Sequence, residues 1–291
     1  MIEYFSRQVW LMDIFTILLT DDCRGKHFVN AGGAMTDADA TQIPIAQTIN
    51  PSGTSSVVLV CEHASCHIPE ALDGLGLSDA AKVSHAAWDP GALGVARQIA
   101  KRLDAVLVAS CVSRLVYDCN RPPEAPGAMP AKSEIFDVPG NVDLSPDQRA
   151  ARAATYYVPF HDLLVQTVAA RPAPLLVTIH SFTPVYNGVT RTVEIGVLHD
   201  ADTRLADTML DLAPTHTSAD VQRNAPYGPG DGVTHTLQVH GTAHGHPNVM
   251  IEVRNDLIRT EAEQAQMGDM LAEWLNDACE KLNAQGVACS A

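Results

Sequence analysis

From residue 57 onward, short aliphatic runs alternate with longer stretches in which apolar residues recur every three or four positions. The short runs are typical of buried strands and the periodic stretches of amphipathic helices. The sequence predicts strands at 57–61, 105–110, 175–179, 193–198 and 249–253. It predicts helices at 89–103, 145–170, 201–212 and 259–282. This alternation indicates an α/β fold, a three-layer sandwich of the phosphorylase/hydrolase-like kind, in which helices flank a mostly parallel mixed sheet.

The first 56 residues do not share this pattern. Residues 9–19 are apolar, but they include Asp13 and fall short of the roughly 20 apolar residues that a membrane span needs. Residues 35–56 are polar, like a tail. We therefore predict an N-terminal extension over 1–56, poorly ordered in part, and a single α/β domain over 57–291.

Charge and cysteine usage narrow the classes of partner. The chain of 291 residues has 19 Lys and Arg against 34 Asp and Glu, a net charge of -15. Such a surface repels nucleic acid and anionic membranes, so we expect neither as a partner. The seven cysteines follow no zinc-finger spacing, and the start of the chain is unlike a signal peptide. These features favour free thiols and a cytoplasmic location; they do not indicate an oligomeric state.

Two histidines follow predicted strands. His63 comes just after the strand in "VVLVCEHAS", and His180 just after the strand in "LLVTIHSF". The carboxyl ends of parallel strands meet at one edge of a sheet, so both side chains are expected in one crevice. Neutral imidazoles are good zinc ligands. The alternative is that each is a structural histidine, hydrogen-bonded at the end of its strand.

Both carboxylates and further histidines are candidates for a third ligand. Asp89 in "WDPGA" is one candidate, although an aspartate before proline is also an ordinary helix N-cap. Glu62, next to His63, is its rival. His67 is a weaker candidate because Pro69 opposes the helix that would align it with His63. The loop "HGTAHGH", with its histidines at 240, 244 and 246, is a less favoured metal site.

Glu252 is an acid inside an apolar strand, "NVMIEVRND". A buried carboxylate must be paired, coordinate a metal or have a raised pKa. A raised pKa suits a general base. The alternative is an ion pair with Arg254.

The segment "SRLVYDCNRPP" concentrates polar groups suited to binding an anion. Asn120 and Arg121 stand before two prolines, and a guanidinium matches a carboxylate bidentately. Arg114 with Asp118 is the obvious structural salt bridge, so Arg121 is the candidate for substrate. The glycine-rich and proline-rich loop 224–235 could bring Tyr227 or His235 over the site, or could be a plain surface connection.

These motifs, in their order from about Val57 to Leu282, resemble the N-formylglutamate amidohydrolase family, which is similar in fold to zinc carboxypeptidases and aspartoacylase. The resemblance implies one zinc per chain, held by His63, Asp89 and His180; such a site would also accept other divalent metals. It further implies that Glu252 is the base and that Asn120 and Arg121 hold a substrate carboxylate. One departure is Cys66, which stands where zinc carboxypeptidases place a glutamate ligand.

The expected function is a zinc-dependent amidohydrolase that cleaves the linear, non-peptide amide of a small N-acyl amino acid. N-formylglutamate is the first choice, giving formate and glutamate, a reaction that belongs with histidine degradation. We expect Arg114 to stabilise the oxyanion, and Tyr227 and Arg254 to assist in binding the acidic substrate. One alternative is a metallo-amidase for another N-acyl amino acid or a peptide-like amide. Another is a non-catalytic protein that binds small acids.

Overall fold

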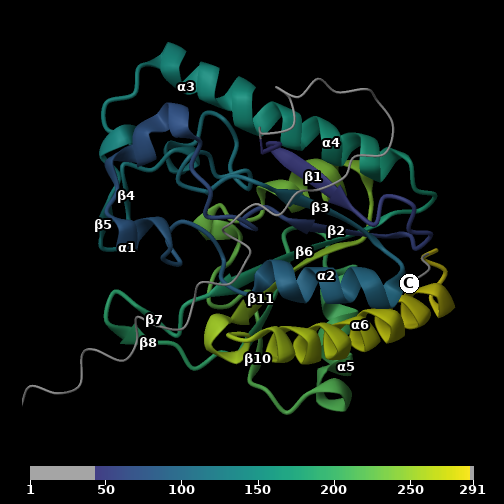
Figure 1. Cartoon of the computed structure of the whole chain (residues 1–291). Helices are drawn as coiled ribbons and strands as arrows, with labels where there is room; N and C mark the ends of the chain where they lie inside the picture. Colours follow the sequence, from purple (N-terminus) through teal and green to yellow (C-terminus); the bar gives the residue numbers. More distant parts are fainter. Residues whose placement is uncertain (1–42, 289–291) are drawn as a thin grey trace, which may run out of the picture. The chain divides into compact units, whose positions relative to one another are not determined.

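One mixed sheet organises residues 43–288, the part of the chain that the computed structural model describes. Its seven strands lie in the order β1-β3-β2-β6-β11-β9-β10 (Figure 1). They are β1 (Ala46–Ile49), β2 (Val57–Cys61), β3 (Val106–Ser110), β6 (Leu175–Phe182), β9 (Ile195–Leu198), β10 (Val221–Arg223) and β11 (Asn248–Arg254). The four strands β3, β2, β6 and β11 run parallel to one another. β1 and β9 are antiparallel to their neighbours β3 and β11. The mostly parallel mixed sheet predicted from the sequence is confirmed.

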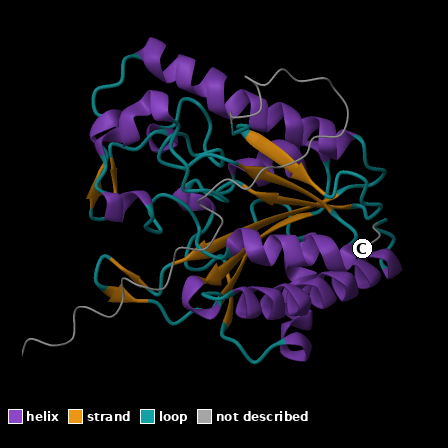
Figure 2. Ribbon diagram, in the orientation of Figure 1, coloured by secondary structure: helices purple, strands orange, loops and turns teal. Residues whose placement is uncertain are grey.

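Helices cover both faces of this sheet (Figure 2). Helices α2 (Ala92–Leu103), α5 (Arg204–His216) and α6 (Glu261–Ala284) pack on one face, where they share a core with alternate β2 residues such as Leu59. Helix α4 (Val158–Ala169) packs on the other face with Val58 and Val60. Alternation of side chains along a strand explains how one apolar run supplies both cores. The three-layer sandwich is therefore confirmed.

The remaining elements are short. Besides short 3-10 helices, they include helices α1 (Asp79–Lys82) and α3 (Pro146–Arg152), hairpin β4 (Lys132–Ser133) with β5 (Phe136–Asp137), and hairpin β7 (Val185–Tyr186) with β8 (Val189–Thr190). The predicted helix 145–170 begins as expected, with Ser145 in a capping box, but a π-helical segment at Ala153–Tyr157 divides it. A second π-helical segment spans Leu237–Gly241.

The start of α2 differs from the prediction in a way that matters for the site. The helix begins at Ala92, and its N-cap is Gly91 at φ 83°, with no side-chain cap. A side chain at Gly91 would also collide with the carbonyl oxygen of Ile258. The side-chain carboxylate of Asp89 therefore does not cap α2.

Two strands of the seven-stranded sheet were not predicted. β1 lies within the segment 1–56 assigned to the extension, and it pairs with β3 at one edge of the sheet. β10 forms the opposite edge, beside β9. Residues 1–42, on which the rest of the extension prediction falls, lie outside the described part of the chain.

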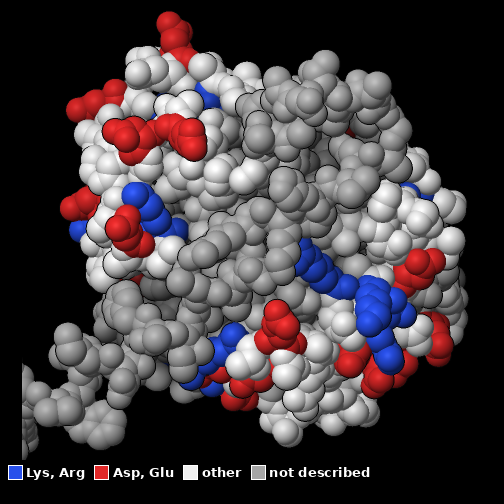
Figure 3. Space-filling view, viewed as in Figure 1, with Lys and Arg blue, Asp and Glu red and all other residues white. Residues whose placement is uncertain are grey.

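Three further features bear on the expectations from composition: the state of the cysteines, the surface charge and the apolar character of the helices. Cys61, Cys111, Cys119 and Cys279 are free and buried, but Cys66 is disulfide-bonded, so the expectation of free thiols is wrong for Cys66. Acidic side chains are scattered over the coloured part of the face in Figure 3. Within 43–288, no helix has the length and apolar character needed to cross a membrane.

Candidate metal centre and active site

The three predicted ligand residues come from separate segments: two follow or end parallel strands, and one lies in the turn before a helix. His63 lies two residues beyond β2, and His180 lies near the end of β6. These two strands are parallel neighbours, so their carboxyl ends coincide. Asp89 lies in the turn before α2, and its backbone nitrogen donates to the carbonyl oxygen of His63 at 2.9 Å. All three residues are buried.

Their side chains converge on one point. The Nδ1 atoms of His63 and His180 are 3.1 Å apart. Oδ2 of Asp89 lies 3.2 Å from Nδ1 of His63 and 2.9 Å from Nδ1 of His180. One ligand atom from each residue thus lies within 4.8 Å of the other two. Two imidazole nitrogens and a carboxylate oxygen so placed could hold a metal ion.

Each imidazole has a carboxylate behind it. Nε2 of His63 lies 2.7 Å from Oδ1 of Asp118, and Nε2 of His180 lies 3.1 Å from Oε2 of Glu62. A proton on each Nε2 leaves each Nδ1 as the lone-pair donor, which is the usual arrangement behind a metal-binding histidine. Glu62 therefore contacts the outer nitrogen of His180, whereas Asp89 contacts both inner nitrogens. This geometry favours Asp89 over Glu62 as the candidate carboxylate ligand.

Burial and nearby positive charges have opposite effects on the pKa values of the carboxylates in this cluster. Burial alone would raise the pKa of Asp89, but His63, His180 and Arg114 hold that pKa well below its ordinary value. Burial likewise opposes ionisation of Asp118, and His63 and Arg114 outweigh it and lower the pKa of Asp118. Both carboxylates are thus anionic at neutral pH. An anionic cluster of this kind favours a divalent cation.

Glu252 lies on β11, beside the strand that carries His180. The two residues are partners in the parallel register of β11 and β6. Glu252 is 5% exposed, and burial raises its pKa to about 7, with the charge of Asp89 adding to the effect. Its Oε2 atom is buried and has no hydrogen-bond partner among the described residues. A carboxyl group with this pKa can both take and return a proton near neutral pH.

Arg254 does not neutralise Glu252. Its Nε donates to Asp256 at 2.7 Å, and its Nη2 lies 3.4 Å from Glu194. Its Nη1 donates to the backbone carbonyl of Thr192 at 3.1 Å. The alternative of a Glu252–Arg254 ion pair is therefore not what the structure shows. These contacts occupy the guanidinium that we had expected to help in binding substrate.

Arg114 bridges two carboxylates of the cluster. Nη1 donates to Asp89 Oδ1 at 3.2 Å, and Nη2 donates to Asp118 Oδ2 at 3.1 Å. The expected Arg114–Asp118 salt bridge is present. The side chain of Arg114 is 28% exposed, whereas those of both carboxylates are almost fully buried. Arg114 therefore lies between the buried cluster and solvent.

Asn120 and Arg121 contact the loop that follows β10. Asn120 donates from Nδ2 to the carbonyl of Val233 at 2.5 Å and accepts from the nitrogen of Thr236 at 3.0 Å. Arg121 donates from Nη1 to the carbonyl of Asp231 at 2.6 Å. Both polar atoms of the Asn120 amide are thus engaged with protein groups. Arg121 stays close to the cluster, with Nε 3.9 Å from Asp118.

Tyr227 lies near the catalytic candidates, together with an arginine that the sequence reasoning missed. Burial raises the pKa of Tyr227, and the nearby charge of Glu252 raises it further. The guanidinium carbon of Arg191 lies 4.7 Å from the centre of the Tyr227 ring. The only sequence signal for Arg191 was its position between the His180 strand and the next predicted strand.

A second group of histidines is distinct from the three metal candidates in its contacts. His240 stacks on His161 with ring centres 4.8 Å apart, and Tyr157 contacts Nε2 of His235 through its hydroxyl at 2.7 Å. His244 and His246 stack on each other at 5.8 Å. Within the described residues, the metal geometry is found only at His63, Asp89 and His180.

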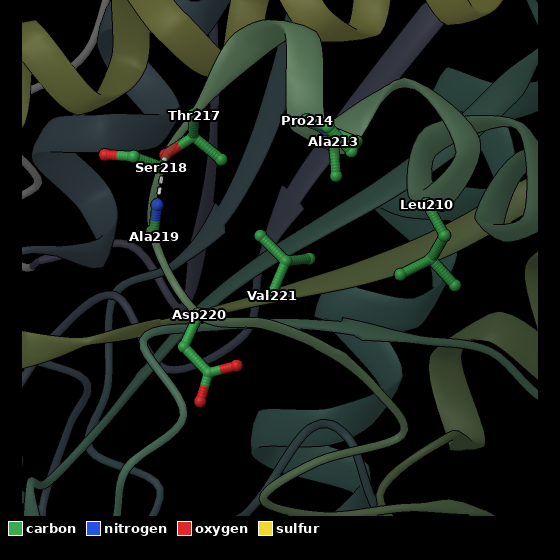
Figure 4. Close-up of a pocket in the computed structure, with 8 residues that line it drawn as sticks. All are labelled: Leu210, Ala213, Pro214, Thr217, Ser218, Ala219, Asp220 and Val221. Carbon is green, nitrogen blue, oxygen red and sulfur yellow. Dashed lines mark hydrogen bonds between the residues drawn. The ribbon is translucent and has the colours of Figure 1, made fainter.

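A hollow of about 390 Å³ opens elsewhere, between the end of α5 and β10 (Figure 4). Its wall is formed by Leu210, Ala213, Pro214, Thr217, Ser218, Ala219, Asp220 and Val221. In its rim, the nitrogen of Ala219 donates to Oγ1 of Thr217 at 3.0 Å. The hollow includes none of the predicted site residues, so it does not belong to the metal centre.

Comparison with known proteins places the chain in a family. A crystal structure of a gene product from Agrobacterium tumefaciens is 52% identical, with a TM-score of 0.81 over 85% of this chain and 98% of that one. The N-formylglutamate amidohydrolase from Ralstonia eutropha shares the fold at 17% identity, with a TM-score of 0.57 over 84% of this chain and 100% of that one. No curated protein matches the chain. The family model for N-formylglutamate amidohydrolase matches residues 55–259. The chain therefore belongs to the N-formylglutamate amidohydrolase family, a family of hydrolases.

Proposed function

We propose that this protein is a zinc-dependent amidohydrolase that cleaves N-formylglutamate, or a closely related N-acyl amino acid, to the free acid and the amino acid. One observation carries the proposal. The inner nitrogens of His63 and His180 and one oxygen of Asp89 converge beside Glu252, a buried carboxyl group with a pKa of about 7. A merely structural cluster would not need an adjacent group that exchanges protons at neutral pH.

The donor set fits zinc. Catalytic zinc sites have three protein ligands of the imidazole and carboxylate kinds and keep a further position for water or substrate. The outer nitrogens of His63 and His180 lie 2.7 Å and 3.1 Å from carboxylate oxygens of Asp118 and Glu62, the kind of group that such sites place beside a histidine ligand. A bound zinc ion would polarise the substrate carbonyl and make a water molecule more acidic.

The proton transfers are assigned to Glu252. Its carboxylate takes a proton from the attacking water, and the water oxygen bonds to the acyl carbon. Glu252 then returns the proton to the nitrogen as the C–N bond breaks, so one water is consumed and formate and glutamate leave. A raised pKa favours both steps, because it makes the carboxylate a stronger base and keeps its acid form accessible.

Arg114 and Arg121 are assigned to the substrate. Arg114 lies between the buried carboxylates and solvent, so its guanidinium can stabilise the negative charge that develops on the acyl oxygen. Arg121 is proposed to hold the α-carboxylate next to the scissile bond. Asn120 acts by fixing the loop at Val233 and Thr236 rather than by touching substrate.

The test is a hydrolysis assay of metal-stripped and zinc-reconstituted protein against N-formyl and N-acetyl amino acids. We expect no turnover without metal, restored turnover with about one zinc per chain, and the highest kcat/KM for N-formylglutamate. A preference for a different acyl group would keep the chemistry and change the substrate. Metal-loaded protein that binds these compounds without cleaving any of them would instead support the small-acid-binding alternative.

A further inference from the structure

Arg191 is held by three aromatic rings at the border of the candidate site. It follows hairpin β7–β8, and its guanidinium carbon lies 4.6 Å from the ring centre of Tyr186 and 4.7 Å from that of Tyr227. The ring centre of Phe182 is 5.6 Å away. We name this arrangement of one arginine and three rings the Arg191 box. Such stacking holds a guanidinium in place without neutralising it.

The guanidinium of Arg191 has different partners from the guanidinium groups of Arg114 and Arg254. Arg114 contacts Asp89 and Asp118. Arg254 contacts Asp256 and Glu194. Within residues 43–288, by contrast, Arg191 forms no ion pair; its Nη1 donates a long hydrogen bond, 3.4 Å, to the carbonyl of Thr183, and its guanidinium also lies within hydrogen-bonding reach of the Tyr227 hydroxyl. A half-buried guanidinium with stacked faces still presents N–H donors in its plane, which suits a carboxylate.

The Arg191 box lies at a distance from the metal candidates that fits a glutamyl side chain. Phe182 is two residues beyond His180 on β6, a step of about 6–7 Å along a strand. Three bonded carbons separate the amide nitrogen of a glutamate from its side-chain carboxyl, a reach of about 5 Å. Tyr227 also joins the box to the catalytic candidates, since the charges of Glu252 and Arg114 both act on its hydroxyl.

The hairpin that carries Tyr186 is tied down from outside. Oε1 of Glu134, at the tip of hairpin β4–β5, accepts a hydrogen bond at 3.0 Å from the nitrogen of Asn187, at the tip of β7–β8. Oε2 of Glu134 lies 2.6 Å from His85. These contacts order the hairpin before a ligand arrives, so less entropy is lost on binding.

We propose that the Arg191 box is a second carboxylate site, which selects N-acyl amino acids with an acidic side chain. Arg191 binds the side-chain carboxylate, while Arg121 holds the α-carboxylate. This inference rests on the proposed function, because it places the scissile amide at the metal centre. It adds the reason why a dicarboxylic substrate is preferred over a neutral one of the same size.

The test compares N-formylglutamate with N-formylglutamine, which has the same shape and no side-chain charge. Arg191→Gln should lower kcat/KM about 10- to 100-fold for N-formylglutamate, mainly through KM, and should leave N-formylglutamine nearly unchanged. Arg191→Lys, which keeps the charge but not the fork, should fall in between. Arg102→Gln, on the distant surface of α2, is the matched control and should change neither substrate.

Equal losses on both substrates, or no loss on either, would overturn the proposal. Binding of glutarate and butyrate to the metal-loaded protein, measured by calorimetry, separates it from the proposed function. Even without turnover, Arg191→Gln should weaken glutarate binding at least about 10-fold and leave butyrate binding as it was. If the wild-type protein cleaves no N-formyl compound but shows this difference, the proposed function fails and the second carboxylate site stands. If glutarate binds equally to both proteins, the site is rejected.

Discussion

Two histidine-rich regions of this molecule differ in the groups that contact their imidazole rings. In the metal candidate, His63 and His180 each have one nitrogen against a carboxylate, Asp118 or Glu62, and the other against Asp89. In the second region, His240 packs against His161, and their ring centres are 4.8 Å apart. Carboxylates surround the first pair, and other rings surround the second.

The pKa values follow this difference. Burial lowers the pKa of His180, but Glu62 and Asp89 outweigh it and raise that pKa well above its ordinary value. For His240, burial lowers the pKa and the nearby His161 and His235 lower it further, to about 3. Positive charge is therefore favoured at His180, where carboxylates supply negative charge, and disfavoured at His240. A high density of histidines in the sequence does not by itself make a metal site.

The largest effect should come from removing one ligand. His180→Ala deletes one of the three converging ligand atoms, so bound zinc should fall from about one per chain to almost none, and hydrolysis should fall to background. Metal content by mass spectrometry and the hydrolysis assay measure both. His244→Ala, at an exposed histidine of the second region, should keep metal and activity. If His244→Ala lost the metal and His180→Ala kept it, the comparison would be reversed.

Removing the proposed base should stop turnover and leave metal binding unchanged. Glu252→Gln keeps the size of the side chain but can no longer take a proton, so kcat should fall about 10²- to 10⁴-fold. Zinc content should be unchanged, because the ligand atoms come from other residues. The measurement is kcat for protein of verified metal content. A variant that still turns over at the wild-type rate would remove Glu252 from the mechanism.

Substitution of Asp89 should weaken metal binding more than substitution of Glu62. Asp89→Asn removes the charge of the candidate anionic ligand and should abolish tight metal binding. Glu62→Gln changes only the group behind His180 and should weaken metal affinity about 10- to 100-fold. Competition with a metal-binding dye measures both affinities. If the larger loss came from Glu62→Gln, Glu62 rather than Asp89 would be the ligand.

The smallest effect concerns stability in acid. The unfolded chain takes up a proton at His240 near pH 6.5, whereas the folded chain resists protonation down to about pH 3. Stability is therefore present above pH 6.5 and is lost as the pH falls. Between pH 7.5 and 5, His240 should cost the folded state about 2 kcal/mol. His240→Gln should lose that much less than the wild type over the same range, as measured by urea unfolding. Equal losses would show that His240 is not held neutral.

Much of the fold could be predicted from the sequence because buried strands have recognisable apolar runs. The runs at 57–61 and 175–179 are fully buried strands, and both cores draw on their alternating side chains. β1 and β10 escaped prediction because these short edge strands are only partly buried and carry no apolar run. Edge strands are held by pairing with a neighbour, which is a contact between distant residues and not a property of the local sequence.

The sequence alone determined that His63 and His180 would share one edge of the sheet, because parallel strands place their carboxyl ends together. It also indicated that Glu252 would be buried, but it left open whether Glu252 would have a raised pKa or pair with Arg254. Only the tertiary structure decided that Asp89 turns inward while Glu62 lies behind His180, and that Asn120 holds a loop. Only the structure brought Arg191 against its three rings. The physical reason is that spacing along a chain fixes which edge a residue reaches, whereas the direction and partners of its side chain depend on elements packed from elsewhere.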